Sequence, residues 1–301
     1  MFCAFLDASK AFDRLVHGGL FLKLIAKGIP KILLDVIIFW YSDLMCRVKW
    51  DDSYSEWFAV KAGVRRGGIL SPDFYCLYVK DLIAILKAKT VGCHILSVFV
   101  AALIYADDIA LLAPSLKGLC ILLDTCNEYC ICLNARKSKL IYFGNRCSNL
   151  FVPSLNETPI EWVESCRYLG VCLVSSKYFR CSVTDRIRKF YKCANAIFRI
   201  EGRSDDPTML SLVETHCVPI LTYGIEIAHF FDSRQKSKIR AAYNSLFRKI
   251  FGYRNFESVT DLQLSLARPT WELLCHSQKD SFYHHLSQCS ADSPVHLFSL
   301  L

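Results

Sequence analysis

The stretch "IYADDIALLA", residues 104–113, places two adjacent carboxylates, Asp107 and Asp108, between two apolar runs. The runs predict the two strands of a hairpin, with "ADD" at its tip. A buried carboxylate that lacks a partner is so costly that it is normally protonated, paired or bound to a metal ion. The sequence therefore predicts a cationic partner at this turn.

A third carboxylate, Asp7, ends a short apolar strand at the start of the chain, in "CAFLDASKAF". Three carboxylates on neighbouring strands of one sheet can hold two divalent cations, the arrangement that clamps both oxygens of an in-line phosphoryl displacement. Asp7 and Asp107 are the expected ligands, with Asp108 beside them. The expected cofactor is two Mg²⁺ ions, or Mn²⁺ in their place, because such hard cations prefer oxygen ligands and share them with substrate phosphates.

The rest of the first half of the chain alternates between strand and helix signals. A helix is expected to begin with Ser71 as its N-cap and Pro72 in its first turn, and an earlier one to present Leu33, Ile37, Trp40 and Tyr41 as a stripe. The expected order is strand, helix, helix, hairpin (47–64), helix, hairpin, helix (116–134) and strand (139–144). This order predicts an α+β fold, an antiparallel sheet with helices packed on one side.

From about residue 185 onward the pattern is mainly helical and strongly basic. Residues 180–254 hold 14 Lys and Arg against 7 Asp and Glu, which is nearly all of the net charge of +8. This concentration favours a phosphate-facing surface, although a solvated basic face is the simpler interpretation of either helix alone. The candidate nucleic-acid-binding residues are Arg186, Arg188, Lys189, Lys192, Lys236, Lys238 and Arg240.

Composition narrows the class of protein. The chain of 301 residues is 53% hydrophobic, which argues against disorder, and its 16 cysteines are scattered through apolar stretches like those of a reduced intracellular protein. Zinc is disfavoured because neither Cys126, Cys130 and Cys132 nor Cys275, His284 and Cys289 completes a four-ligand spacing. The acidic start excludes a signal peptide, and the aspartates interrupt the longest apolar run, so no membrane association is expected.

Five motifs occur in the order typical of one polymerase family. They are "FLDASKAFD" (5–13), "GVRRGGILSP" (63–72), "YADD" (105–108), "LNARKSK" (133–139) and "YLGV" (168–171). With "VPILTYGIEI" (218–227) and "NSLFRKIFGYRNFESVTDL" (244–262), they resemble the reverse transcriptase domain and C-terminal extension of non-LTR (LINE-type, jockey- or RTE-like) retrotransposons. The resemblance implies a right-hand polymerase palm at 1–175 and a mainly α-helical thumb with C-terminal extension at 176–301.

The resemblance also implies a role for individual residues. Asp7, Asp107 and Asp108 would be the catalytic, metal-binding carboxylates, and Lys137 would lie near the triphosphate. Without the resemblance, Lys137 would be interpreted as an ordinary charged residue of the surface. Phe12 would meet the sugar edge of the incoming dNTP and disfavour a 2′-hydroxyl, against the alternative of a core phenylalanine. The remaining substrate-binding candidates, in the second motif, are Arg65, Arg66, Gly67 and Gly68.

Two departures from the family pattern qualify this interpretation. Arg66 stands where the family usually has glutamine, which replaces an amide near the nucleotide by a guanidinium. Met1 stands only six residues before Asp7, so an N-terminally truncated domain with its fingers largely missing is expected.

The leading hypothesis is an RNA-directed DNA polymerase that uses an RNA template, a DNA primer and dNTPs in the nucleus or cytoplasm, with no obligate protein partner. The alternative is a catalytically inactive nucleic-acid-binding remnant. A maturase-like or telomerase-like polymerase ranks lower.

Overall fold

The computed structural model describes residues 1–8, 11–65, 67–129, 133–145, 150–200, 205–226 and 231–288. The chain forms two compact units, Met1–Val163 and Glu164–Leu301. The predicted lobe boundary after residue 175 falls inside the second unit, between two strands of its small sheet.

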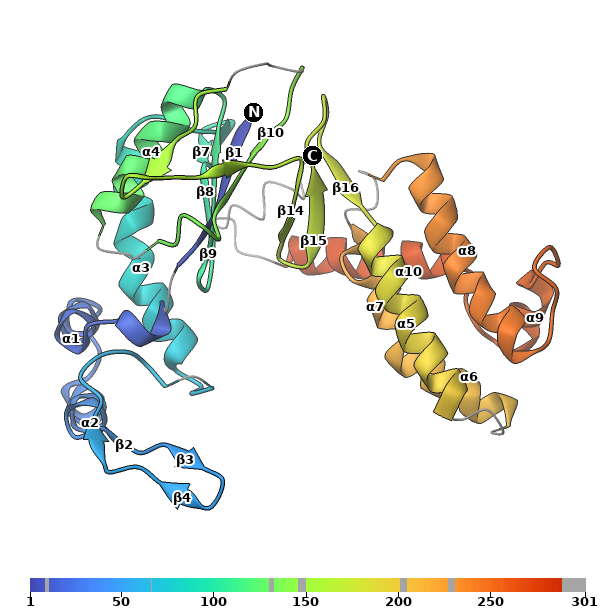
Figure 1. The fold of residues 1–301 in the computed structure, drawn as a ribbon, viewed down its shortest axis with the longest axis horizontal. Helices are drawn as coiled ribbons and strands as arrows, with labels where there is room; N and C mark the ends of the chain where they lie inside the picture. The colour runs from blue at the N-terminus through green and yellow to red at the C-terminus, as the bar shows by residue number, and fades with distance from the viewer. Residues whose placement is uncertain are drawn as a thin grey trace. The chain divides into compact units, whose positions relative to one another are not determined.

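The first unit is built around a five-stranded sheet in the order β13–β10–β1–β9–β8 (Figure 1). Its strands are β1 (Phe2–Asp7), β8 (Ala102–Tyr105), β9 (Asp108–Ala113), β10 (Lys139–Tyr142) and β13 (Glu161–Trp162). The central strand, β1, runs antiparallel to both of its neighbours, β9 and β10, and only the short edge strand β13 pairs in parallel. The strand that carries Asp7 is therefore hydrogen-bonded on both sides.

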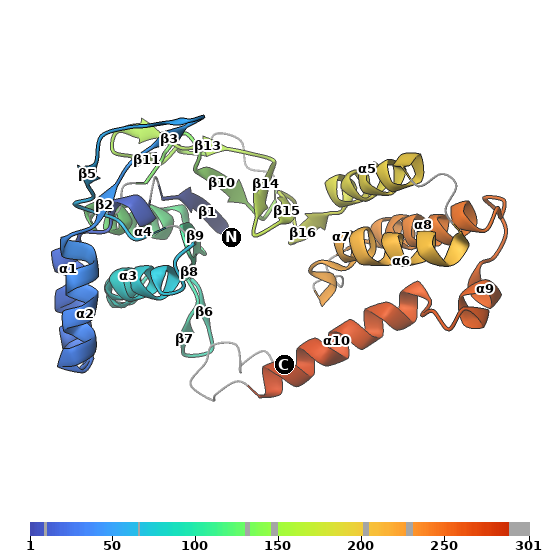
Figure 2. The same ribbon diagram turned by 90° about the horizontal axis from the view of Figure 1, so that it is seen from below.

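Two helices, α3 (Ser71–Ala88) and α4 (Leu116–Glu128), lie against the same face of this sheet (Figures 1 and 2). Their inner side chains form the main core with alternate residues of the strands. Fully buried members of this core are Leu6, Leu82, Leu86, Ile109, Leu111, Leu119 and Leu122. The prediction of an α+β fold with helices on one side of an antiparallel sheet is confirmed.

A second core lies beside the first, between α1 (His17–Ala26), α2 (Lys31–Ser42) and the start of α3. The predicted stripe on α2 is confirmed at Ile37 and Tyr41, which lie in or against this core, and wrong at Leu33 and Trp40, which are each 55% exposed. Leu34 is buried instead. Both sides of α2 are apolar in sequence, so periodicity alone could not identify the side that packs on α1.

Short elements complete the first unit. They are η1 (Phe12–Arg14), β2 (Met45–Cys46), β3 (Lys49–Trp50), β4 (Ser53–Tyr54), β5 (Phe58–Ala59), β6 (His94–Ile95), β7 (Val98–Phe99), β11 (Ser154–Leu155) and β12 (Thr158–Pro159). The hairpin predicted around Asp51 and Asp52 is confirmed by the pairing of β3 with β4.

The second unit is a small sheet followed by helices. Its antiparallel strands are β14 (Ser165–Tyr168), β15 (Val171–Val174) and β16 (Arg180–Ser182). The helices are α5 (Thr184–Ile200), α6 (Asp206–His216), α7 (Val218–Thr222), α8 (Ser233–Ile250), α9 (Thr260–Ser265) and α10 (Trp271–Ser287). The inner face of α8 follows the helical spacing of its apolar residues: Ile239, Ala242, Tyr243, Leu246 and Phe247 are buried.

The cysteines in the described part of the chain are free thiols, and no helix there is both long and apolar enough to cross a membrane. Three members of the zinc combinations, Cys130, Cys132 and Cys289, lie outside the described residues.

Candidate active site

The hairpin of β8 and β9 turns at Ala106 and Asp107, between the paired residues Tyr105 and Asp108. Ala106 has a φ of +52°, and a positive φ at the first central residue is what a two-residue turn needs to match the twist of its strands. The predicted hairpin is thus confirmed, although Asp108 is already the first residue of β9 rather than part of the tip. Asp107 is consequently exposed and Asp108 half-buried.

The third aspartate reaches the same edge of the sheet. Asp7, the last residue of β1, pairs in register with Asp108, and the backbone nitrogen of Ala8 donates to the carbonyl oxygen of Asp107 at 3.2 Å. Strand pairing therefore brings together the three aspartates that the sequence singled out, although Asp7 and Asp107 are 100 positions apart in the chain.

The charges of these aspartates act on one another. Burial, followed by the charges of Asp107 and Asp7, raises the pKa of the Asp108 carboxyl above its usual range. Like charges held this close favour either protonation or a bound cation. The oxygen donors suit a hard divalent ion, and strand register holds their backbones in place. Among the residues that the structure describes, however, no three His, Cys, Asp or Glu side chains already converge as a ligand set.

Lys137 lies on a loop that packs on the end of β1, with its Nζ 3.7 Å from Oδ2 of Asp7. The side-chain oxygen of Asn134 shapes this loop by accepting from the backbone nitrogens of Arg136 and Lys137, at 3.1 and 3.3 Å. The Asn134 nitrogen donates to the Asp7 carbonyl at 2.9 Å, and the buried Ser138 hydroxyl accepts from the Asp7 nitrogen at 3.3 Å.

Asn134 and Ser138 are thus positioning residues that the sequence interpretation missed. The available signal was an asparagine that opens a turn and bonds to the backbone two residues on.

Phe12, in η1, is joined by its backbone to the loop of the second motif. The nitrogen of Val64 donates to the Phe12 carbonyl at 2.8 Å, and that of Gly63 donates to the Leu15 carbonyl at 2.7 Å. Gly63 has a φ of +92°, and a Cβ there would lie 2.8 Å from the Cα of Asp13. Only glycine permits this close approach, which sets the position of Phe12.

The loop then closes on itself before α3. The Ser71 hydroxyl donates to the Arg65 carbonyl at 2.5 Å, and the Gly68 nitrogen donates to the same oxygen at 3.0 Å. The prediction that Ser71 caps the helix is wrong: Leu70 is the N-cap, without a side-chain bond, because the hydroxyl of Ser71 is used to close the loop. Gly67 has a φ of +80° and faces open space. Arg66 lies outside the described residues.

Tyr75, on α3, connects the two halves of this region and was not predicted. Its ring centroid lies 5.0 Å from that of Phe12, and the side chain is buried. Burial, followed by the charge of Asp107, raises the pKa of Tyr75 to about 12. Its hydroxyl has no hydrogen-bond partner among the residues described, although buried hydroxyls are normally paired.

This unpaired hydroxyl leads to a test of stability. Tyr75→Phe should raise the free energy of unfolding by about 1–2 kcal/mol, because it removes a buried polar atom that gains no bond on folding. Tyr243→Phe is the matched control, because that buried tyrosine donates to the Pro269 carbonyl at 2.9 Å. In the same denaturant titration, the free energy of unfolding of the control should fall by about 1 kcal/mol. An equal fall in both variants would show that the Tyr75 hydroxyl has a hydrogen-bond partner.

The basic residues predicted on α5 have different surroundings. Arg186 and Lys189 line a hollow of ≈ 420 Å³ together with Arg167 and Tyr223. Arg186 is half-buried, and burial lowers the pKa of its guanidinium. Arg188 pairs with Asp185 at 3.3 Å. Lys192 is exposed. The hollow thus gathers three cations from β14 and α5.

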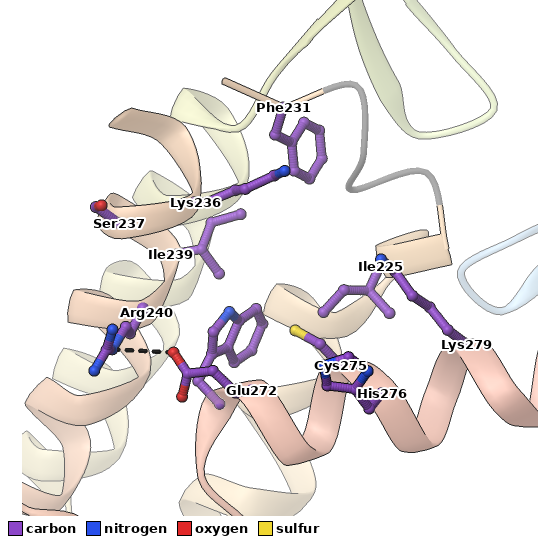
Figure 3. A pocket seen from close by; sticks show the side chains of 11 residues that line it. Ile225, Phe231, Lys236, Ser237, Ile239, Arg240, Glu272, Cys275, His276 and Lys279 are labelled. Atoms are coloured by element: carbon purple, nitrogen blue, oxygen red, sulfur yellow. Dashed lines mark ion pairs between the residues drawn. The ribbon is translucent and has the colours of Figure 1, made fainter. Parts of the chain in front are cut away.

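On α8, the predicted residues Lys236, Lys238 and Arg240 are all exposed. Lys236 and Arg240 line a pocket of ≈ 280 Å³ between α8 and α10, and Figure 3 shows Lys236 extending toward Phe231. The Arg240 guanidinium is 3.1 Å from a carboxylate oxygen of Glu272, so part of its charge is already balanced.

The family model described as reverse transcriptase (RNA-dependent DNA polymerase) matches residues 1–173, more than half of the chain. The chain belongs to the reverse transcriptase family. This match confirms the predicted resemblance to reverse transcriptases.

Similar proteins come from mobile elements of Drosophila melanogaster. The chain is 26% identical to the RNA-directed DNA polymerase from mobile element jockey over 88% of its own length and 30% of that protein. It is 28% identical to the probable RNA-directed DNA polymerase from transposon X-element, over 93% of its own length and 31% of the relative. The chain thus spans about a third of the length of these relatives. Among solved structures, telomerase from Candida albicans aligns at 12% identity over 85% of this chain and 41% of that one, with a TM-score of 0.44.

Proposed function

We propose that this reverse transcriptase domain acts as an RNA-directed DNA polymerase, extending a DNA primer on an RNA template. The observation that carries the proposal is the strand register that sets Asp7 opposite Asp108 and bonds Ala8 to Asp107 at the open end of the central strand. Family membership supports the reaction class. We assign residues 1–175 to the palm and 176–301 to the thumb and C-terminal extension.

In this proposal Asp7 and Asp107 hold two Mg²⁺ ions, or Mn²⁺ in their place, and Asp108 adds negative charge beside them. When bound, these ions neutralise charge on the α-phosphate and activate the attacking 3′-hydroxyl. The chain's own contribution is positioning: β1 is hydrogen-bonded on both sides, so the backbone that carries Asp7 is held in place. Lys137, which the Asn134 turn holds 3.7 Å from Asp7, is the residue that we propose to approach the leaving pyrophosphate.

Phe12 is the proposed gate against ribonucleotides, because the family resemblance implies that a ring at this position meets the sugar edge of the incoming nucleotide. Phe12→Ala should reduce the preference for dNTP over rNTP by about 10- to 100-fold, measured as the ratio of kcat/KM values. Phe12→Tyr keeps a ring at this position and should retain the wild-type preference. A preference unchanged in Phe12→Ala would assign the side chain to the core alone.

The loop of Arg65, Arg66, Gly67 and Gly68 is proposed to contact the nucleotide. Template and primer would be held through phosphate contacts to the basic residues of α5 and α8, which predicts sequence-independent affinity that falls with salt. No obligate protein partner is invoked.

The test is primer extension by the 301-residue chain on an RNA template with a DNA primer, in Mg²⁺ and in Mn²⁺, against Asp107→Ala. Extension by the wild type that is lost in Asp107→Ala supports the proposal. Extension that persists in Asp107→Ala would contradict the assignment of this carboxylate.

A second candidate is a nucleic-acid-binding domain without catalysis. It is favoured by Arg66 in place of the usual glutamine and by the lack, within the described ranges, of a converged metal-ligand set. It predicts equal retention of template-primer by the wild type and by Asp107→Ala, with extension by neither.

A further inference from the structure

A hairpin arm, defined here as residues 45–59, joins α2 to the loop of the second motif (Figure 1). β2 pairs with β5 at its base, and β3 pairs with β4 around the turn at Asp51. All residues from 47 to 59 are exposed. A two-stranded hairpin that buries no side chain is marginally stable in water, so this arm is built as a surface for something else.

Four of the exposed side chains on the arm are aromatic. The exposed fractions are 77% for Trp50, 52% for Tyr54, 57% for Trp57 and 48% for Phe58. Exposed rings at this density mark an interaction site rather than ordinary surface. The arm therefore offers several ring faces to one ligand.

A cation is held against two of these rings. The guanidinium carbon of Arg47 lies 3.9 Å from the ring centroid of Tyr54 and 4.8 Å from that of Trp57. The Nζ of Lys49 lies 5.8 Å from the same tyrosine centroid. Aromatic rings and stacked guanidinium planes are the groups with which proteins bind unpaired bases.

Charge separates the arm from the basic helices. Within the arm, the two cations Arg47 and Lys49 stand against the three anions Asp51, Asp52 and Glu56. An arm without net positive charge cannot draw a nucleic acid by general attraction to phosphate. Its binding energy must come from stacking, which depends much less on salt than phosphate contacts do.

The arm is rooted at the proposed nucleotide site. The Val60 nitrogen donates to the Leu44 carbonyl at 2.8 Å and closes its base. Three residues later, Gly63 is bonded to the segment that carries Phe12. A strand bound on the arm would therefore lie beside the loop that contacts the nucleotide.

We propose that the arm binds single-stranded nucleic acid, stacking unpaired bases of the RNA template on Tyr54, Trp57 and Arg47. The choice of RNA as ligand rests on the proposed function, but the binding itself requires no catalysis.

The experiment measures binding of fluorescently labelled 12-nucleotide strands to the full chain by anisotropy, at low and at 0.5 M NaCl. An unstructured RNA, the DNA of the same sequence and a blunt duplex serve as probes. Trp57→Ala and Tyr54→Ala should each weaken single-strand binding by about 5- to 150-fold, the loss expected for one stacked base, and should leave duplex binding unchanged. The loss should persist at high salt, where contacts to phosphate are screened.

Matched controls come from α2 of the same unit. Phe39 and Trp40 are 67% and 55% exposed, so Phe39→Ala and Trp40→Ala remove comparable apolar surface outside the arm and should leave affinity unchanged. Arg47→Lys keeps the charge but loses the planar stack, and should weaken binding as the ring variants do.

Several outcomes would overturn the proposal. Equal affinity of the arm variants and the α2 controls would do so, as would a loss that disappears at high salt. A change in sedimentation caused by the arm variants, without a change in affinity, would assign the arm to contacts between copies of the chain. If single-strand binding depends on the arm but the chain extends no primer, only the polymerase proposal is overturned. If extension depends on Asp107 but the arm variants bind as the wild type does, only the proposal for the arm is overturned.

Discussion

Replacing Asp7 with asparagine should lower the rate of nucleotide incorporation by about 10³-fold or more, while the sheet keeps its stability. The main-chain bonds of Asp7, to Ser138 and Asn134, do not involve its carboxylate and survive the change. What is lost is a negative charge beside Asp108, at the point where the proposed cations are held. Single-nucleotide incorporation measured with saturating dNTP gives the rate directly.

The effect of Mg²⁺ on the Tm is a second measurement on the same variant, and it does not depend on catalysis. If Asp7 contributes to cation binding, Mg²⁺ should raise the Tm of the wild-type protein and raise that of Asp7→Asn much less. Asp124→Asn, an exposed aspartate on α4, is the control and should behave as the wild type in both assays. Undiminished incorporation or an undiminished Mg²⁺ shift in Asp7→Asn would remove Asp7 from the site.

Gly63→Ala should be the most destabilising single substitution near the site, at about 3–5 kcal/mol. The φ of +92° strains any side chain, and the new Cβ would also lie 2.8 to 2.9 Å from the backbone of Phe12 and Asp13. Since backbone atoms cannot rotate away, the segment that carries Phe12 must move. Urea unfolding measures the loss, and the dNTP preference should fall with it.

Gly28→Ala separates strain from crowding. Gly28 also has a positive φ, +74°, but a Cβ there meets nothing within 4 Å. We expect a cost of only about 1–2 kcal/mol for this variant, from backbone strain alone. If the two variants were equally destabilised, the close contact between Gly63 and the Phe12 segment would not exist in solution.

Elements of both units followed from local sequence pattern. The hairpin at "ADD" was predictable because two apolar runs flank a polar pair, and the inner face of α8 because its apolar residues recur at helical spacing. The stripe on α2 was only half right, at Ile37 and Tyr41, because apolar residues occupy both sides of the helix. The burial of Leu34 in place of Leu33 depended on packing against α1. The prediction of Ser71 as N-cap was wrong because its hydroxyl donates to the Arg65 carbonyl. No local sequence rule identifies this hydrogen bond.

The sequence by itself determined the α+β class, the family and the three aspartates, because motif order and the cost of a buried carboxylate can be read from the chain alone. Only the tertiary structure decided which groups meet. Strand register placed Asp7 against Asp108, and the Asn134 turn brought Lys137 to Asp7. The packing of α3 buried the hydroxyl of Tyr75, which has no hydrogen-bond partner in the described residues. These are contacts between residues far apart in sequence, and their positions depend on how whole elements pack, which residue spacing does not encode.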